Sequence, residues 1–482
     1  MKNLSTILLL LTLPLFQGCD DVLVERNYGQ IADSDYWNTE ADAVAAIKAA
    51  YASTRGGWQG LSFWQFCVED MGTDISTGGY FAVNDYIAYT GWSGTTPDFV
   101  DWGIWGDFWK SINYANTVLD KVPEMDIDEG VKNRVIGEAH AIRAMVYFYL
   151  VNWFGGVPEL TTAKEAPLEI PRQSVESNYL LIENDLKAAI ELLPDKSTLI
   201  STGELDYGRV TNGAARGLLS KVYQQQGKWA ECASMALEVI TSGEYSLEPE
   251  YKDIFALQNE GFGNTEVIWV LPFITGTSPN VDANVFQVYI WKASENTDYS
   301  NYYDWNGEIR ATSNFYNSFE SGDLRRKLLF ASSDAMDNPI MMIKYPPDPA
   351  TEGAHSGTDY PFIRLADILL TRAEALANLD DLTGAIQEVN KVRSRAGLSN
   401  LDPANYTKVS LLNHILNERR WELYFEGHNK RDMIRMNREG MLAYIKSQSS
   451  DWETYTAERY LLLPLPSNAI ASNPGLIQNP GF

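Results

Sequence analysis

The sequence predicts a mainly α-helical protein, in which irregular, TPR-like helical hairpins form a scaffold for long, aromatic-rich loops and a few short strands. Two observations support this fold class. Apolar residues recur at spacings of three and four along several long segments, which is the period of one helix face. Between these segments lie stretches that are rich in Tyr, Trp, Asn and Gly and have no such period. The length of 482 residues allows one large domain or two to three smaller ones.

The first residues have the pattern of a targeting segment. Residues 7–16 form an apolar run that is too short to span about 30 Å of hydrocarbon. The segment Leu15–Cys19 that ends this run resembles a bacterial lipobox. We therefore expect residues 1–18 to be a signal peptide and Cys19 to carry acyl chains that anchor the protein in a membrane. An ordinary signal peptide with an incidental cysteine is the alternative. Asp20-Asp21 resembles an acidic signal for export to the cell surface.

Several single helices are predicted from apolar spacing and from the residues that end each pattern. Asn133–Val151 has one apolar face, and the Gly155-Gly156 pair after it ends the helix. A similar pattern runs up to Pro194. A further strong pattern covers Leu411–Arg438 and is interrupted at Gly427.

Two segments have the pattern of helical hairpins and invite comparison with the TPR period. Asn212–Ile240 turns near Gly227, and Arg364–Arg395 turns near Asp380. In each, small or apolar residues stand 5, 9 and 12 positions after the turn, where a second helix would pack closely. The alanines that we expect at close helix contacts are Ala139, Ala215, Ala373 and Ala385. We place TPR-like hairpins near residues 133–160, 208–242, 362–397 and 409–438.

The segment Glu244–Pro361 has no helical period and few strand patterns. A stretch of this length cannot be a simple linker inside a compact domain, so it must carry structure or function. We interpret residues 244–361 as an elaborated loop region with a few short strands. Since no Pro/Ser-rich hinge separates folding units, residues 19–482 are predicted to form a single domain.

Charge and aromatic content limit the classes of partner. The formal net charge is −26, and such an acidic chain repels phosphate backbones, so we expect no nucleic-acid binding. Aromatic residues make up 12% of the chain, and tryptophan is plentiful. Flat, amphipathic side chains in this number indicate a binding surface.

The sequence contains few patterns that indicate catalysis or metal binding. The four histidines have no metal-ligand spacing, and neither a metal nor a cofactor is predicted. Acidic pairs such as Asp33–Asp35 and Glu69-Asp70 are interpreted as a solvated face or a helix cap, in preference to the two carboxylates of a glycoside hydrolase. For Cys67 and Cys232, two buried free thiols are favoured over a disulfide.

Motifs along the whole chain beyond residue 18 resemble those of the SusD/RagB family. In order, they are Phe148–Pro158, Gly208–Asn212 leading into Leu218–Tyr223, Arg364–Ala375 with Val389–Arg393, Glu418–His428, Leu463–Pro466 and Asn473–Phe482. Two positions depart from the family pattern. Asn429 stands where arginine is usual, and Ala469 stands where an acidic residue is common. Both departures put local packing in doubt and leave the resemblance intact.

The resemblance implies a non-enzymatic lipoprotein of the outer membrane that faces the cell exterior. Such proteins capture nutrient oligosaccharides and deliver them to a SusC-like TonB-dependent outer-membrane transporter. Their helices form the scaffold that faces the transporter, and their loops form the ligand site. The outer-membrane lipid would hold the protein through acylated Cys19. A peptide-capturing RagB-like binder is one alternative, and a surface glycoside hydrolase is a more distant one.

Two aromatic stretches are the candidate ligand site, because ring faces match the C–H face of a sugar and amides bond its hydroxyl groups. The resemblance supports these stretches by location only. Trp92 and Trp305 are the strongest candidates, since each lies in a loop with no helical period to bury it. The other candidate ligand-binding residues are Asn84, Tyr86, Tyr89, Trp291, Asn301 and Tyr302. Which glycan is bound, and whether calcium supports a loop, stay open.

Overall fold

The structure is a computed structural model of the chain. It describes residues 36–55, 60–71, 73–78, 104–163, 169–203, 206–273, 309–331, 340–342, 344–346, 357–448, 459 and 461–482. Helices dominate these ranges, and the strands are short. The predicted fold class, a mainly α-helical scaffold with a few short strands, is therefore confirmed.

The helices before residue 193 pack around one long helix. They are α3 (Glu40–Arg55), α4 (Leu61–Glu69), α7 (Ile104–Lys121), α8 (Glu129–Phe154) and α9 (Val175–Leu192). α8 contacts α3, α7 and α9. It begins where the Asp128 side chain accepts hydrogen bonds from the backbone N–H groups of Gly130 and Val131, at 2.9 and 3.1 Å. It ends at Gly155, whose φ of +76° suits a residue without a Cβ.

Two helical hairpins follow, as the apolar spacing predicted. They are α11 (Asn212–Gln225) with α12 (Trp229–Thr241), and α14 (Leu365–Asn378) with α15 (Leu382–Arg395). Gly227 and Asp380 turn the chain with φ values of +67° and +66°. Ala215, Ala373 and Ala385 are fully buried, so the small positions do lie at close helix contacts. Because α12 also packs on α14, the two hairpins form one continuous layer.

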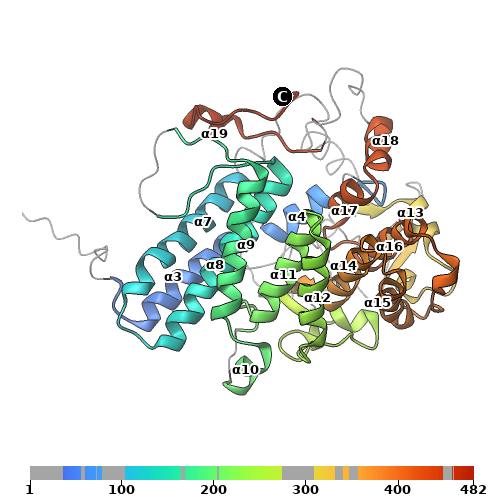
Figure 1. Cartoon of the computed structure of the whole chain (residues 1–482), viewed down its shortest axis with the longest axis horizontal. Helices are drawn as coiled ribbons and strands as arrows, with labels where there is room; N and C mark the ends of the chain where they lie inside the picture. Colours follow the sequence, from blue (N-terminus) through green and yellow to red (C-terminus); the bar gives the residue numbers. More distant parts are fainter. Residues whose placement is uncertain are drawn as a thin grey trace, which may run out of the picture.

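The last helices complete the scaffold. They are α16 (Lys408–Leu423), α17 (Asn429–Met436), α18 (Arg438–Gln448) and α19 (Ser467–Ser472). Gly427 separates α16 from α17, as predicted, and its φ is +69°. A Cβ at this glycine would lie 2.4 Å from Cγ of Gln65, so α4 approaches this turn too closely for any side chain. Figure 1 shows α3 and α7–α9 on one side, α11 and α12 in the middle, and α14–α16 on the other side.

Two small antiparallel sheets connect the loop region to the helices. One has the strand order β1 (Ser76–Gly78), β3 (Ile309–Ala311), β5 (Ile340–Met342) and β4 (Leu329–Ala331). The other pairs β2 (Val267–Leu271) with β6 (Tyr360–Arg364). β6 runs directly into α14. The remaining short helices are α10 (Lys196–Ser201), α13 (Ser313–Ser318) and the 3-10 turns Val122–Glu124, Tyr251–Phe255, Leu257–Asn259, Leu324–Leu328 and Pro403–Asn405.

Some sequence predictions need refinement. The helix predicted around residues 133–160 is the single helix α8, so the hairpin that it joins extends to α9. Cys67 and Cys232 are both buried, and neither forms a disulfide within the described part of the chain, which agrees with the favoured interpretation of two thiols. No helix in the described ranges has both the length and the apolar character that crossing a bilayer requires.

Candidate functional site

The predicted ligand-binding residues lie in two stretches, 79–103 and 274–308, which are outside the described residues. Cys19 is also outside them. The structure describes the framework from which both stretches depart.

That framework brings the two stretches together at one pair of residues. β1 and β3 are antiparallel neighbours, and Gly78 is the register partner of Ile309. Gly78 is the last described residue before the first stretch, and Ile309 is the first described residue after the second. The sheet therefore joins one end of each stretch, although more than 200 positions separate them in the sequence.

A pocket of about 390 Å³ lies where the second stretch begins. Its walls come from the C-terminal part of α3, the connection before α11 and the end of β2, whose continuation Phe273 is the last described residue before position 274. The lining residues are Lys48, Tyr51, Thr54, Arg55, Asp206, Tyr207, Gly208, Arg209, Val270, Leu271, Pro272 and Phe273. This volume falls within the range of about 300–1,000 Å³ that is typical of small-molecule sites.

Two tyrosines of the pocket are fixed by hydrogen bonds. The Tyr51 hydroxyl accepts the backbone N–H of Val210 at 2.9 Å. The Tyr207 hydroxyl donates to the Asp359 carboxylate at 2.5 Å, and the other oxygen of Asp359 accepts the N–H of Phe273 at 2.9 Å. Asp359 therefore holds together two walls of the pocket. Burial raises the pKa of Asp359 to about 6, against the opposing effect of these hydrogen bonds.

Each charged side chain that lines the pocket already has a polar partner. Lys48 forms an ion pair of 3.0 Å with Asp206 at the rim. Arg209 lies 2.9 Å from the buried carboxylate of Glu138. Arg55 donates to the carbonyl of Pro272 at 3.0 Å. No pattern in the sequence indicates this pocket, because its lining comes from three segments that are far apart and have no common motif.

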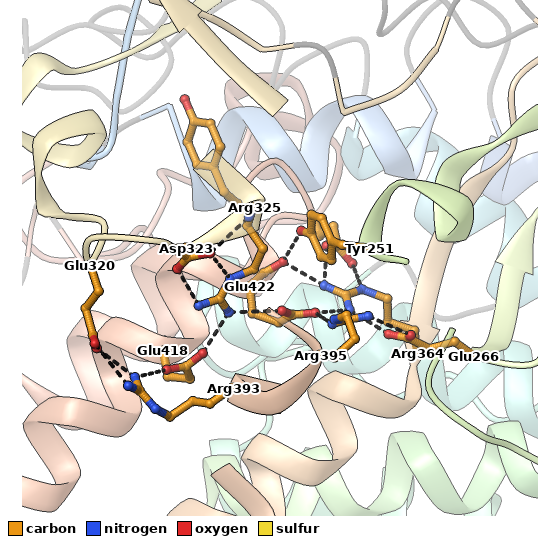
Figure 2. Close-up of polar contacts among 12 residues, drawn as sticks. Tyr251, Glu266, Glu320, Asp323, Arg325, Arg364, Arg393, Arg395, Glu418 and Glu422 are labelled. Atoms are coloured by element: carbon orange, nitrogen blue, oxygen red, sulfur yellow. Dashed lines mark hydrogen bonds and ion pairs between the residues drawn. The ribbon is translucent and has the colours of Figure 1, made fainter. Parts of the chain in front are cut away.

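The most extensive polar cluster of the described residues is largely buried. Figure 2 shows arginines from the end of β6, from α15 and from the Leu324–Leu328 turn interleaved with carboxylates of α16, of the segment before β2 and of the segment before that turn. The labelled residues are Tyr251, Glu266, Glu320, Asp323, Arg325, Arg364, Arg393, Arg395, Glu418 and Glu422. Most of these side chains are buried, and no lining residue of the 390 Å³ pocket belongs to the cluster.

Arg364 is the most heavily bonded residue of this cluster. Its Nη1 lies 2.8 Å from Glu266 and 2.5 Å from Glu422, and its Nε and Nη2 each lie 2.7 Å from Glu426. Burial alone would raise the pKa of Glu422, but Arg395 and Arg364 outweigh it and hold that pKa well below its usual range. The cluster therefore fastens the loop region to the helices and has the character of a structural element.

Glu69 and Asp70 require a correction, because the sequence suggested a solvated face or a helix cap. Both are buried. Asp70 accepts the backbone N–H groups of residues 427–429 at 3.0–3.1 Å, and Glu69 accepts the N–H of Arg431 at 3.0 Å. The pair thus caps a helix, and that helix is α17, which lies more than 350 residues away in the sequence. The predicted alternative of a solvated face is wrong, because both carboxylates are buried where α4 packs against the start of α17.

Asn429, one of the two departures from the family pattern, lies beside this cap. It is 3% exposed, and neither its amide oxygen nor its amide nitrogen has a hydrogen-bond partner among the described residues. Ala469, the other departure, is buried in α19. The doubt about local packing is therefore justified for Asn429.

The histidines of the described residues have structural surroundings. His140 contacts Asp185 at 2.7 Å, and Arg143 holds the same carboxylate. Burial, together with the nearby Lys221, keeps the pKa of His428 well below its usual value, so this imidazole stays neutral. No group of three or more potential metal ligands occurs in the part of the chain that the structure describes.

Comparison with known proteins identifies the class to which this fold belongs. Residues 338–482 match the family model described as "SusD family", and residues 81–224 match the one described as "Starch-binding associating with outer membrane". A SusD-like protein of Formosa agariphila is 27% identical, with 100% of this chain and 99% of that protein covered. A SusD-like protein of Bacteroides ovatus is 25% identical, with 92% and 84% covered.

Solved structures show the same fold. A laminarin-binding SusD-like protein superposes with a TM-score of 0.77 at 24% identity, over 92% of this chain and 100% of that one. A SusD homologue from Bacteroides thetaiotaomicron gives 0.79 at 23% identity, over 93% and 98%. The fold is that of SusD-like proteins. The chain belongs to the SusD/RagB family.

Proposed function

We propose that this protein is a cell-surface lipoprotein that binds nutrient oligosaccharides and delivers them to a SusC-like TonB-dependent transporter in the outer membrane. The observation that carries the proposal is family membership along nearly the whole chain. One matching family model is described as starch-binding, and one structural neighbour is described as laminarin-binding. Acylated Cys19 would anchor the protein in the outer membrane, facing outward.

The framework supports placing the ligand at the two aromatic stretches. Because β1 pairs with β3, one end of each stretch departs from the same point. Trp92 and Trp305, one in each stretch, would then stack on neighbouring parts of a single glycan chain. Each aromatic contact is worth about 0.5–1.5 kcal/mol beyond the area that it buries, so the loss of two costs at least about 1–3 kcal/mol, which is a factor of about 5–150 in affinity.

We propose binding without catalysis. The buried carboxylates described above are held in ion pairs or by backbone N–H groups, so they serve packing and not proton transfer to a ligand. We therefore expect the protein to bind an oligosaccharide and to release it chemically intact.

Calorimetry with oligosaccharides of laminarin and of starch, and with peptides, tests the proposal. We expect at least one glycan to bind, and the double variant Trp92→Ala/Trp305→Ala to bind it at least tenfold more weakly. Tyr114→Ala is the matched control, since Tyr114 is an exposed aromatic residue on α7. Its affinity should equal that of the wild type.

The other outcomes contradict the proposal in separate ways. Full affinity in the double variant would remove Trp92 and Trp305 from the site. Binding of peptides alone would favour a peptide-capturing protein. New reducing ends after incubation would identify a glycoside hydrolase.

A further inference from the structure

The 390 Å³ pocket between α3, the connection before α11 and the end of β2 has walls that are fixed before any ligand arrives. Gly208 lies so close to Pro272 that a Cβ there would be 2.4 Å from the proline Cγ. The Asp359 carboxylate bonds Tyr207 and Phe273, as described above. A site of fixed shape binds with little loss of conformational entropy.

The lining combines aromatic rings with hydrogen-bonding groups. Tyr51, Tyr207 and Phe273 supply the rings. At the rim, the side chains of Lys48 and Asp206 are 57% and 49% exposed, so a donor and an acceptor are open to solvent. Rings beside paired donors and acceptors match a sugar, which has apolar C–H faces and hydroxyl groups around its edge.

The charge balance distinguishes a neutral ligand from a charged one. Lys48 is paired with Asp206, and Arg209 is paired with Glu138. Asp359 is close enough to Arg55 for the guanidinium to oppose the rise in its pKa. The Lys48–Asp206 pair is exposed and costs little to separate. A charged sugar that competed for Arg209 would disturb its pair with the fully buried Glu138, whereas a neutral sugar can bond beside this pair without separating it.

The place of the pocket relates it to the proposed binding site. Phe273 lines the pocket, and the stretch 274–308 with Trp291, Tyr302 and Trp305 begins immediately after it. A glycan chain long enough to contact both this stretch and the pocket would gain from the raised effective concentration of its units at the pocket.

We propose that this pocket is a second contact site, which takes a unit of a neutral oligosaccharide that is also held by the aromatic stretches. The inference rests on the proposed function and extends it, since no aromatic candidate from the sequence lies in the pocket. The proposal is limited to uncharged glycans, so the pocket should add nothing to the affinity for acidic glycans.

The test closes the rim of the pocket and leaves the two aromatic stretches unchanged. Asp206→Trp places a large side chain at the rim, and Lys48→Ala/Asp206→Ala removes both polar side chains without adding bulk. Asp107→Trp is the matched control, because Asp107 forms a comparable exposed pair with Lys110 on α7, at 2.9 Å and with 35% and 67% exposed side chains. All variants are checked by thermal unfolding before calorimetry with heptasaccharides from laminarin and from amylose.

We expect Asp206→Trp to weaken heptasaccharide binding at least tenfold and Lys48→Ala/Asp206→Ala at least threefold, with Asp107→Trp within twofold of the wild type. Wild-type affinity in both pocket variants would overturn the inference, while the proposed function would stand. Failure of the wild type to bind any glycan would instead refute the proposed function. Weaker binding in the pocket variants and the control alike would also overturn the inference, since the effect would not come from the pocket.

Discussion

Replacement of Arg364 by methionine tests whether the buried ionic cluster determines how firmly the loop region is attached. Arg364 is 1% exposed and contacts the side chains of Glu266, Glu422 and Glu426. Arg364→Met leaves these carboxylates buried with one cation fewer. Each retains another partner, since Arg395 contacts Glu266 and Glu422, and Lys344 contacts Glu426.

Breaking a buried pair by removing one partner costs about 3–5 kcal/mol. We expect Arg364→Met to lower the free energy of unfolding by an amount within this range at pH 8. For a slope of about 3 kcal/mol per M of urea, the midpoint of unfolding would fall by about 1–1.7 M. The 14 tryptophans give a strong fluorescence signal for this measurement.

The destabilisation caused by Arg364→Met should depend on pH, and the direction of this dependence follows from the pKa of Glu422. In the wild type the pKa of Glu422 is held low, so its ion pairs contribute stability above the unfolded pKa of about 4.3, and this is lost as the pH falls through the folded pKa. In Arg364→Met, Glu422 loses one of the cations that hold its pKa low, so its pKa rises. Glu422 then takes up a proton more readily, and the deficit in the free energy of unfolding relative to the wild type should narrow as the pH falls from 8 to about 4.5.

Arg216→Met is the control for this experiment. Arg216 pairs with Glu238 at 3.0 Å, but the side chains are 30% and 50% exposed. Pairs of this kind contribute about 0–1 kcal/mol. The reasoning would be refuted if Arg364→Met cost no more than Arg216→Met, or if its deficit widened in acid.

Three further predictions concern packing, a titrating carboxyl and the anchor. Ala215→Leu and Ala385→Leu should each lower the free energy of unfolding by about 1–3 kcal/mol through overpacking, because both alanines are fully buried. Unchanged thermal midpoints in both variants would show that the helices have room for the larger side chain. The pKa of Asp359 is raised to about 6, so between about pH 4 and 6 the folded protein binds more protons than the unfolded one, and the stability from this group declines as the pH rises. Asp359→Asn should therefore flatten the dependence of the unfolding free energy on pH in this window. An equal slope in wild type and variant would contradict the prediction. Cys19→Ala should release the protein from the membrane fraction, and retention there in cells without the transporter would refute the lipobox prediction.

The helical scaffold was largely predictable from the sequence, because its signals are local. Apolar spacing and the residues that end each pattern predicted both hairpins and the break at Gly427. The turn at Asp380 was also visible, although its positive φ was not. Close helix packing at Ala215 and Ala385 followed from small residues at regular spacing.

The buried charges were not predictable in the same way. Glu418 and Glu422 are one helical turn apart, a spacing that is equally typical of a solvated helix face. Only the tertiary fold places Arg325, Arg364 and Arg395 against them. The 390 Å³ pocket escaped prediction for the same reason, since its walls meet only after folding.

The cap that Glu69 and Asp70 form on α17 has a consequence for the order in which the chain folds. Its hydrogen bonds join residues 357–362 positions apart in the sequence. Contacts of such separation form slowly, because a long loop must close before they stabilise anything. While the chain emerges during synthesis or export, the backbone N–H groups that this pair caps are absent until nearly nine-tenths of the chain is available, although Glu69 can meet Trp153 earlier. The native state can therefore be completed only after almost the entire chain has left the ribosome or the translocation channel, and truncation before α17 should leave α4 without its place in the core.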